Sequence, residues 1–200
     1  MNLKTSTKTK KQSSLKTARE YYARAREHFL ADKLNDAEAD YTNAILRNKT
    51  FAEAWIFRGD IYAKTEKHDM AIENFEEASR LVSANNQLRP GEDSKHKAII
   101  LSRIAAAKLA QGKHDDAIRF SAQSAKLMES YTMEEDFAEP WYIQGMGWLK
   151  RGRDDRALHC FSCATAKYTR DACYINSLLE RARILRKSAR ASLLVRTSEI

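Results

Sequence analysis

Turn-forming residues are scarce in this sequence, which has only two prolines, Pro90 and Pro140, and six glycines in 200 residues. A protein built of many short strands needs more such residues at its turns, so the scarcity argues against a β-rich fold. Alanine, leucine, lysine, arginine and glutamate, which favour helices, are abundant instead. We therefore expect an all-α protein, of a length that suits one domain with a sizeable core.

Long apolar runs are also missing. No run approaches the ~20 residues that cross a bilayer, and the N-terminal segment MNLKTSTKTKKQSSLK lacks the apolar centre of a secretory signal. The three cysteines, Cys160, Cys163 and Cys173, are an odd number near one end and do not form a disulfide framework. We expect a soluble, cytoplasmic protein with reduced thiols.

The net charge of +8 is concentrated at the two ends of the chain. Residues 1–17 hold five lysines and no acid, and residues 167–200 hold eight basic and three acidic residues. The middle of the chain is slightly acidic. We expect residues 1–14, which are basic and poor in apolar residues, to form a disordered tail ahead of a folded region over 15–200.

A set of five positions recurs along the chain. Tyr21, Ala25, Ala37, Tyr41 and Ala44 return 34 residues later as Trp55, Gly59, Ala71, Phe75 and Ala78. Two further copies are Leu101, Ala105, Ala117, Ser121 and Ser124, and Trp141, Gly145, Ala157, Phe161 and Ala164. A bundle of unrelated amphipathic helices would not repeat the same residue set at this period.

The repeated set predicts helical hairpins. A large residue and a small residue four positions later lie on one face of a first helix. Two alanines on a second helix let the backbones approach, and the aromatic residue between them fills the remaining space. We expect hairpins at about 18–51, 52–85, 98–131 and 138–171. The polar segment SANNQLRPGEDSKHK, before the third hairpin, is expected to be an exposed loop.

The stretches AEAWIFRGDIYAKTEKHDMAIENFEEAS and AEPWYIQGMGWLKRGRDDRALHCFSCAT resemble the tetratricopeptide-repeat (TPR) family. Arg58 and Gln144 replace the leucine of its pattern. The resemblance implies a right-handed superhelical solenoid of antiparallel hairpins, and it implies a non-catalytic module that binds other proteins.

The solenoid needs a cap at its end. Residues 172–195 carry apolar residues at steps of three and four, with basic residues elsewhere around the helix. The stripe consists of Leu178, Ala182, Leu185, Ala189 and Leu193. We therefore expect a C-terminal capping helix.

No phosphate-binding, dinucleotide-binding, nucleophile-elbow or zinc-protease motif occurs in the sequence. His159, Cys160, Cys163 and Cys173 are the one group that could suggest a metal, because Cys160 and Cys163 are one helical turn apart. No second C-x₂-C follows, and cysteine is a common small packing residue in helices. We therefore expect neither a catalytic centre nor a cofactor, and zinc at the cysteines remains the less favoured alternative.

In the TPR family, first helices line a concave surface on which partner peptides lie. The resemblance implies that a partner segment would contact Tyr22, Arg26, Ile56, Phe57, Asp60, Arg103, Tyr142, Ile143 and Met146. The alternative is that some of these side chains pack against neighbouring helices or under the basic ends. A surface this apolar favours a segment docked through apolar anchors.

A TPR subgroup of co-chaperones binds the C-terminal carboxylates of heat-shock chaperones through a Lys/Asn/Asn/Lys/Arg set. The matching positions here hold Tyr22, Arg26, Phe57, Ile99 and Arg103, so only the last agrees. A different alternative is that the basic ends, Lys4–Lys16 and Arg181–Arg190, bind nucleic acid or an anionic membrane. The sequence favours a protein or peptide partner without naming it, and it leaves the oligomeric state open.

Overall fold

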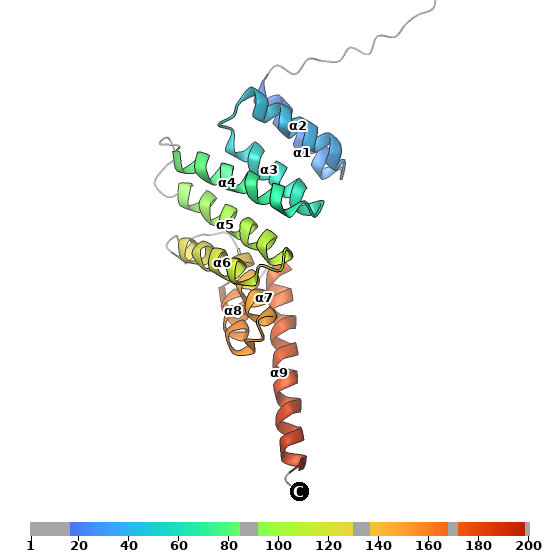
Figure 1. Ribbon diagram of the computed structural model, residues 1–200, viewed down its shortest axis with the longest axis vertical. Coiled ribbons are helices and arrows are strands. Elements are labelled where there is room, and N and C mark those ends of the chain that lie inside the picture. The colour runs from blue at the N-terminus through green and yellow to red at the C-terminus, as the bar shows by residue number, and fades with distance from the viewer. Residues whose placement is uncertain (1–16, 85–91, 130–136, 168–171, 199–200) are drawn as a thin grey trace, which may run out of the picture. The chain divides into compact units, whose positions relative to one another are not determined.

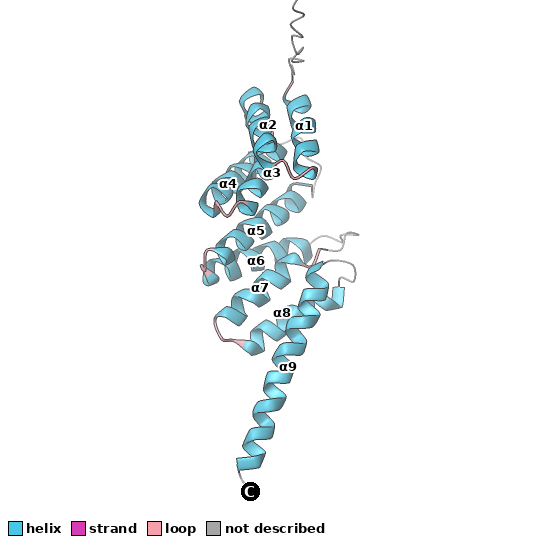
Figure 2. Ribbon diagram, turned by 90° about the vertical axis from the view of Figure 1, so that its right-hand side faces the viewer, coloured by secondary structure: helices cyan, strands magenta, loops and turns pink. Residues whose placement is uncertain are grey.

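The computed structural model describes residues 17–84, 92–129, 137–167 and 172–198, and side chains only as far as residue 191. The predicted N-terminal tail at 1–14 therefore lies outside the described residues, as does the side chain of Leu193. Every regular element in the described ranges is an α-helix (Figure 2). None of these helices is long and apolar enough to span a membrane.

The helices pair into hairpins that follow the sequence repeat (Figure 1). Their bounds are α1 (Ala18–Leu30), α2 (Leu34–Arg47), α3 (Ala52–Lys64), α4 (His68–Ala84), α5 (Glu92–Ala110), α6 (His114–Glu129), α7 (Glu139–Lys150), α8 (Asp154–Lys167) and α9 (Ala172–Ser198). The chain separates into two compact units, Met1–Phe51 and Ala52–Ile200. Each unit is described by itself, and the single domain over 15–200 stays a prediction.

The first unit contains one hairpin, α1 with α2. Thr17 begins α1 with a capping box, in which its hydroxyl accepts from the Glu20 amide and the Glu20 carboxylate accepts from the Thr17 amide. Tyr41 is fully buried between the two helices, beside the small residues Ala25 and Ala37. The close approach predicted from the repeat is therefore present in this hairpin.

The second unit stacks three hairpins and α9, and each helix packs against the next one along the chain. In the hairpins α3–α4 and α7–α8, a phenylalanine ring of the second helix packs on a glycine of the first helix. A Cβ atom added to Gly59 would lie 2.6 Å from Cε1 of Phe75, and one added to Gly145 would lie 2.5 Å from Cε1 of Phe161. Each ring lies almost directly on the backbone of the facing helix, which explains why the repeat places glycine there.

The third hairpin begins earlier than predicted. Helix α5 starts at Glu92, so residues 92–97 are helical and do not belong to the exposed loop that the polar composition suggested. Ala98, where the third hairpin was predicted to begin, is fully buried, and its carbonyl oxygen accepts a hydrogen bond from the Ser124 hydroxyl on α6 at 2.6 Å. Packing against α6 and α4 thus extends the helix beyond the repeat.

Helix α9 packs against α8 and α7, but through a different face from the one predicted. Ile184 is 7% exposed and lies in an apolar cluster with Ala157 and Phe161. The predicted stripe faces solvent, with Leu178 40% exposed and Leu185 53% exposed. The expectation that this stripe closes the end of the solenoid is therefore wrong, although the helix itself is present.

The close packing of Phe161 on Gly145 leads to a stability prediction. Gly145→Val should lower the free energy of unfolding by about 1–3 kcal/mol, because the larger side chain overpacks this contact. In a Phe161→Leu background the same substitution should cost less, since the ring edge that it meets is gone. Urea denaturation of the four proteins measures both effects, and equal costs in the two backgrounds would show that this contact does not control the hairpin.

Candidate functional site

The first helices of the second unit form a cavity of about 280 Å³. Asp60 on α3 and Arg103 on α5 lie in its wall, with Glu139 at the start of α7. Four alanines also line it, namely Ala63, Ala106, Ala107 and Ala110, together with His68 and Phe75 of α4. The small side chains leave room for a ligand group to approach the backbone of α5.

Three charged groups meet in this cavity. Nε of Arg103 lies 2.8 Å from Oδ1 of Asp60 in an ion pair whose side chains are 29% and 20% exposed. A hydrogen bond holds the Glu139 carboxylate in place: its Oε2 accepts from the hydroxyl of the fully buried Ser102 at 2.8 Å. Two carboxyl groups therefore share the cavity with one guanidinium.

The pKa of Asp60 is raised to about 6, mainly by burial; the charge and hydrogen bonding of Arg103 oppose the shift, and the negative charge of Glu139 adds to it. Near neutral pH most of the Asp60 carboxyl groups are ionised. With Arg103 and Glu139 charged, the group then carries a net negative charge. The cavity is therefore chemically suited to a cationic group.

Asp60 and Arg103 were both predicted as partner-binding residues, and the structure places them side by side. Glu139 was not among the predicted partner-binding residues. Its signal in the sequence is its place two residues before Trp141, which puts it at the entry to a first helix. Spacing alone did not show that Ser102 on α5 would hold it toward the cavity.

Two of the predicted contact residues are buried instead of open to a partner. Ile56 is 7% exposed and packs with Ile100 and Ile104 of the next hairpin. Ile143 is 4% exposed and packs with Ala105 of the preceding hairpin. The prediction that these isoleucines point outward is wrong, because stacked neighbours cover positions that a lone hairpin would expose.

The remaining predicted residues are partly or fully accessible. Phe57 is half-buried, whereas Tyr142 and Met146 pack against the cluster around Phe161 and Ile184. The ring of Tyr142 lies 6.0 Å from that of Phe161 between centroids. The alternative that some groove residues pack against neighbouring helices therefore holds for Tyr142 and Met146.

Tyr22 and Arg26 belong to the first unit. Tyr22 lies 5.0 Å from Phe51 and 5.8 Å from Tyr41 between ring centroids, while Arg26 is exposed. Tyr22 therefore has a packing role within its own hairpin. Whether either residue contacts a partner stays a prediction.

Comparison with solved structures identifies the architecture. No protein-family model and no curated protein matches the sequence. A crystal structure of the MamA protein matches with a TM-score of 0.66 and 13% identity, covering 91% of this chain and 88% of that one. MamA 41-end from Desulfovibrio magneticus RS-1 gives 0.62 and 12%, covering 92% and 97%. YrrB, described as a TPR protein with an unusual peptide-binding site, gives 0.60 and 18%, covering 86% and 78%.

This chain has the TPR fold. The predicted all-α solenoid of helical hairpins is confirmed by these matches. Identities below one fifth establish the fold alone, so the partner has to be argued from the residues of this chain.

The TPR hairpins differ at one internal pair of positions, where the first helix faces the second. In the first hairpin Arg24 pairs with Asp40 through two hydrogen bonds. In the second, Nε of Arg58 donates to Oδ1 of Asn74 at 2.8 Å. The third hairpin has the apolar residues Ile104 and Phe120 at these positions, and both pack in one cluster. The pair thus changes from charged to polar to apolar along the TPR array.

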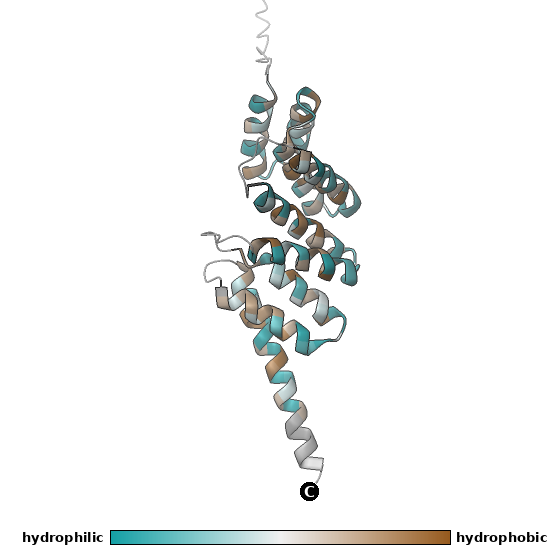
Figure 3. Cartoon of the chain, turned by 90° about the vertical axis from the view of Figure 1, so that its left-hand side faces the viewer, coloured by the Kyte–Doolittle hydropathy of each residue, from teal (hydrophilic) through white to brown (hydrophobic). Residues whose placement is uncertain are grey.

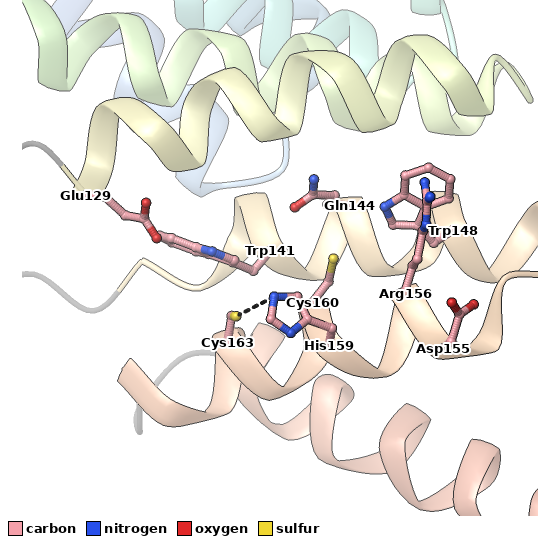
Figure 4. Close-up of a pocket in the computed structure, with 9 residues that line it drawn as sticks. All are labelled: Glu129, Trp141, Gln144, Trp148, Asp155, Arg156, His159, Cys160 and Cys163. Carbon is pink, nitrogen blue, oxygen red and sulfur yellow. Dashed lines mark hydrogen bonds between the residues drawn. The ribbon is translucent and has the colours of Figure 1, made fainter.

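The fourth TPR hairpin has Gln144 and Cys160 at this pair, and a cavity of about 490 Å³ opens there (Figure 4). Trp141 and Trp148 also line it, with Arg156 stacked 4.5 Å from the Trp148 ring centroid. The cavity lies away from the acidic site described above and has no residue in common with it.

The cysteines lie in and beside this second cavity without forming a ligand cluster in the described part of the chain. Sγ of Cys163 lies 3.8 Å from Nε2 of His159, while Cys160 points separately toward the cavity (Figure 4). Burial raises the pKa of the Cys160 thiol to about 11, which keeps it protonated at neutral pH. A neutral buried thiol suits packing better than metal binding or nucleophilic attack.

The acidic cavity of the TPR array gives a prediction about pH. The carboxyl carbon of Asp60, followed by NMR, should titrate with a midpoint near 6. Glu139→Gln should lower that midpoint by removing a negative neighbour, and Arg103→Gln should raise it by removing a positive one. His68 also lines the cavity, so His68→Gln serves as a control for a proton gained by the imidazole.

The same shift predicts the direction of stability. The folded pKa lies above the ordinary value of 3.8, so the folded state holds the proton more tightly than the unfolded state. The contribution of Asp60 to stability should therefore fall as pH rises from about 4 to about 6. Asp60→Asn should remove this component from the pH profile of urea denaturation. An unchanged profile together with an ordinary Asp60 midpoint would contradict the burial of this carboxyl group.

Proposed function

We propose that this chain is a non-catalytic protein interaction module that binds a segment of another protein along the first helices of its second unit. The observation that carries the proposal is the cavity that Asp60, Arg103 and Glu139 line together with four alanines. A partner backbone can approach the small alanine side chains closely, and a positively charged side chain can reach the carboxylates. The TPR fold supports this reading, since YrrB is described as having a peptide-binding site.

The charge of the cavity indicates which segment would fit. Two carboxylates and one guanidinium favour a lysine or arginine side chain over an acidic one. Phe57, half-buried on α3 near Asp60 in the sequence, would supply an apolar contact beside this charge. We therefore propose a partner segment that combines a basic residue with an apolar anchor.

Co-chaperone function fits this cavity poorly. A C-terminal carboxylate would meet Asp60 and Glu139, and the Arg103 guanidinium that could attract it is already paired with Asp60. Nucleic acid would meet the same repulsion at this site. Binding of nucleic acid or an anionic membrane would have to use the basic ends instead, and steep weakening by salt would mark that mode.

Selection from a display library of random peptides tests the proposed function. The full chain should enrich peptides that contain lysine or arginine next to an apolar residue. Asp60→Asn combined with Glu139→Gln should weaken the selected peptides about tenfold or more, which is 1.4 kcal/mol, because both attractive carboxylates are lost. Phe57→Ala should cost about 2 kcal/mol if the ring is an anchor.

Asp116→Asn is the matched control. Asp116 lies on α6, the second helix of its hairpin, and its carboxylate pairs with Arg119 outside the cavity. Its affinity for the selected peptides should equal that of the unsubstituted protein. Cys160→Ser with Cys163→Ser should likewise leave binding unchanged. Enrichment of acidic peptides, or equal losses in the Asp116 control and the cavity variant, would refute a binding site at Asp60 and Glu139.

A further inference from the structure

Exposed apolar side chains in the described part of the chain gather on α9. Seven large apolar side chains are exposed among the described residues, and four of them belong to this one helix. Ile175 is 59% exposed and Leu179 is 52% exposed, in addition to Leu178 and Leu185. Apolar surface concentrated on one element needs a reason, whereas scattered exposed residues do not.

The apolar residues follow a spacing that is specific for helix packing. Ile175, Leu178, Ala182, Leu185 and Ala189 alternate steps of three and four residues over four turns. This is the narrow seam of a coiled coil, with isoleucine or alanine at one position of the heptad and leucine at the other. The two alanines are exposed as well and would let another helix approach closely.

The stripe lies far from the surface by which α9 is held. At 100° per residue, its members stand roughly 100 to 180° around the helix axis from Ile184. Ile184 packs on α8, Nη1 of Arg181 donates to the Thr165 hydroxyl at 2.9 Å, and Nζ of Lys187 donates to Asp154 at 2.8 Å. In this orientation, with Ile184 against α8, the stripe faces away from α8 and stays exposed.

The surroundings of the stripe can receive a partner. Leu185 and Leu158 line a hollow of about 450 Å³ where α9 meets the start of α8. Further along, α9 extends past α7 and α8 (Figure 1), and apolar and polar residues alternate along the part of it whose side chains are described (Figure 3).

The charge beside the stripe decides what kind of helix fits. Arg183, Arg186, Lys187 and Arg190 surround a second hollow of about 570 Å³ on α9. The sequence of α9 contains one acid, Glu180, and that carboxylate is paired with Arg183. A second copy of α9 would bring arginine against arginine. An acidic helix would form ion pairs along the flank instead.

We propose that the apolar stripe of α9 is the docking surface for an acidic amphipathic helix of another protein. This helix would place leucine or isoleucine on Leu178 and Leu185 and glutamate or aspartate beside Arg186 and Arg190. The two exposed alanines of the stripe favour a helix over a lipid surface, since helices that lie in membranes present large apolar residues on that face. The surface is separate from the acidic cavity of α3, α5 and α7.

Two synthetic peptides of three heptads test this proposal. Both carry isoleucine and leucine at the core positions, and they differ only in having glutamate or lysine at the flanking positions. Fluorescence anisotropy with the full-length protein should show the glutamate peptide binding about tenfold tighter or more. Equal binding of the two peptides, or no binding of either, overturns the proposal.

Variants locate the binding. Leu178→Gln with Leu185→Gln should weaken the glutamate peptide about tenfold or more, while the helicity measured by circular dichroism stays the same because both side chains are exposed. Leu30→Gln with Leu46→Gln, at two exposed leucines of the first unit, is the matched control and should bind as the unsubstituted protein does. Arg186→Glu with Arg190→Glu should reverse the preference in favour of the lysine peptide.

The other occupants of the stripe give different results. A dimer in sedimentation equilibrium that dissociates in the Leu178→Gln, Leu185→Gln variant would assign the surface to a second copy. Binding to phosphatidylserine vesicles that the same variant abolishes would assign it to lipid. Either result overturns the proposal, and neither depends on whether the Asp60 cavity binds peptide.

Discussion

The close contact between an aromatic ring and a glycine backbone determines how the hairpins α3–α4 and α7–α8 are built. Phe75 lies on Gly59 and Phe161 lies on Gly145, at distances that leave no room for a Cβ atom. Because the ring is held at this point, the two helices of a hairpin have one register, and the remaining faces of both helices are directed toward neighbours. Where the first hairpin has Ala25 in place of glycine, its partner Tyr41 is still fully buried. The third hairpin has the small pair Ala105 and Ser121 at these positions, and both are fully buried.

This contact is also why so much of the fold could be predicted from the sequence. The five positions around it occur four times at one internal spacing, with an aromatic ring opposite the small residue in three of the copies, so the existence and order of the hairpins followed directly. The boundary of the third hairpin did not follow, because Glu92–Lys97 belongs to no repeat and becomes helical through the packing that begins at Ala98. A periodic pattern describes the interior of a repeat, whereas tertiary contacts decide where its helices start.

The candidate site was only partly predictable for a related reason. Asp60 and Arg103 lie on first helices at accessible positions, and their pairing needed only that the hairpins stack. Ile56, one residue before Phe57 on α3, and Ile143 on α7 also lie on first helices, yet the next and the preceding hairpin bury them. A one-residue step turns a side chain by about 100° around the helix, which is enough to move it from the groove to the stacking interface. Glu139 is directed into the cavity by Ser102, a contact across 37 residues that no local pattern encodes.

Helix α9 shows the limit of reading burial from an apolar stripe. It carries a regular stripe and, on another side, a surface with Ser177, Glu180, Arg181, Ile184 and Lys187. The side that packs on α8 instead carries the buried Ile184, and Arg181 and Lys187 on that side bond to Thr165 and Asp154. Apolar burial is non-directional, so the stripe can be covered by another molecule. Leaving leucines in water has a free-energy cost of up to about 1.5–3 kcal/mol for each side chain that could have been fully buried. A helix from a partner would recover that free energy, which connects the orientation of α9 to a role in binding.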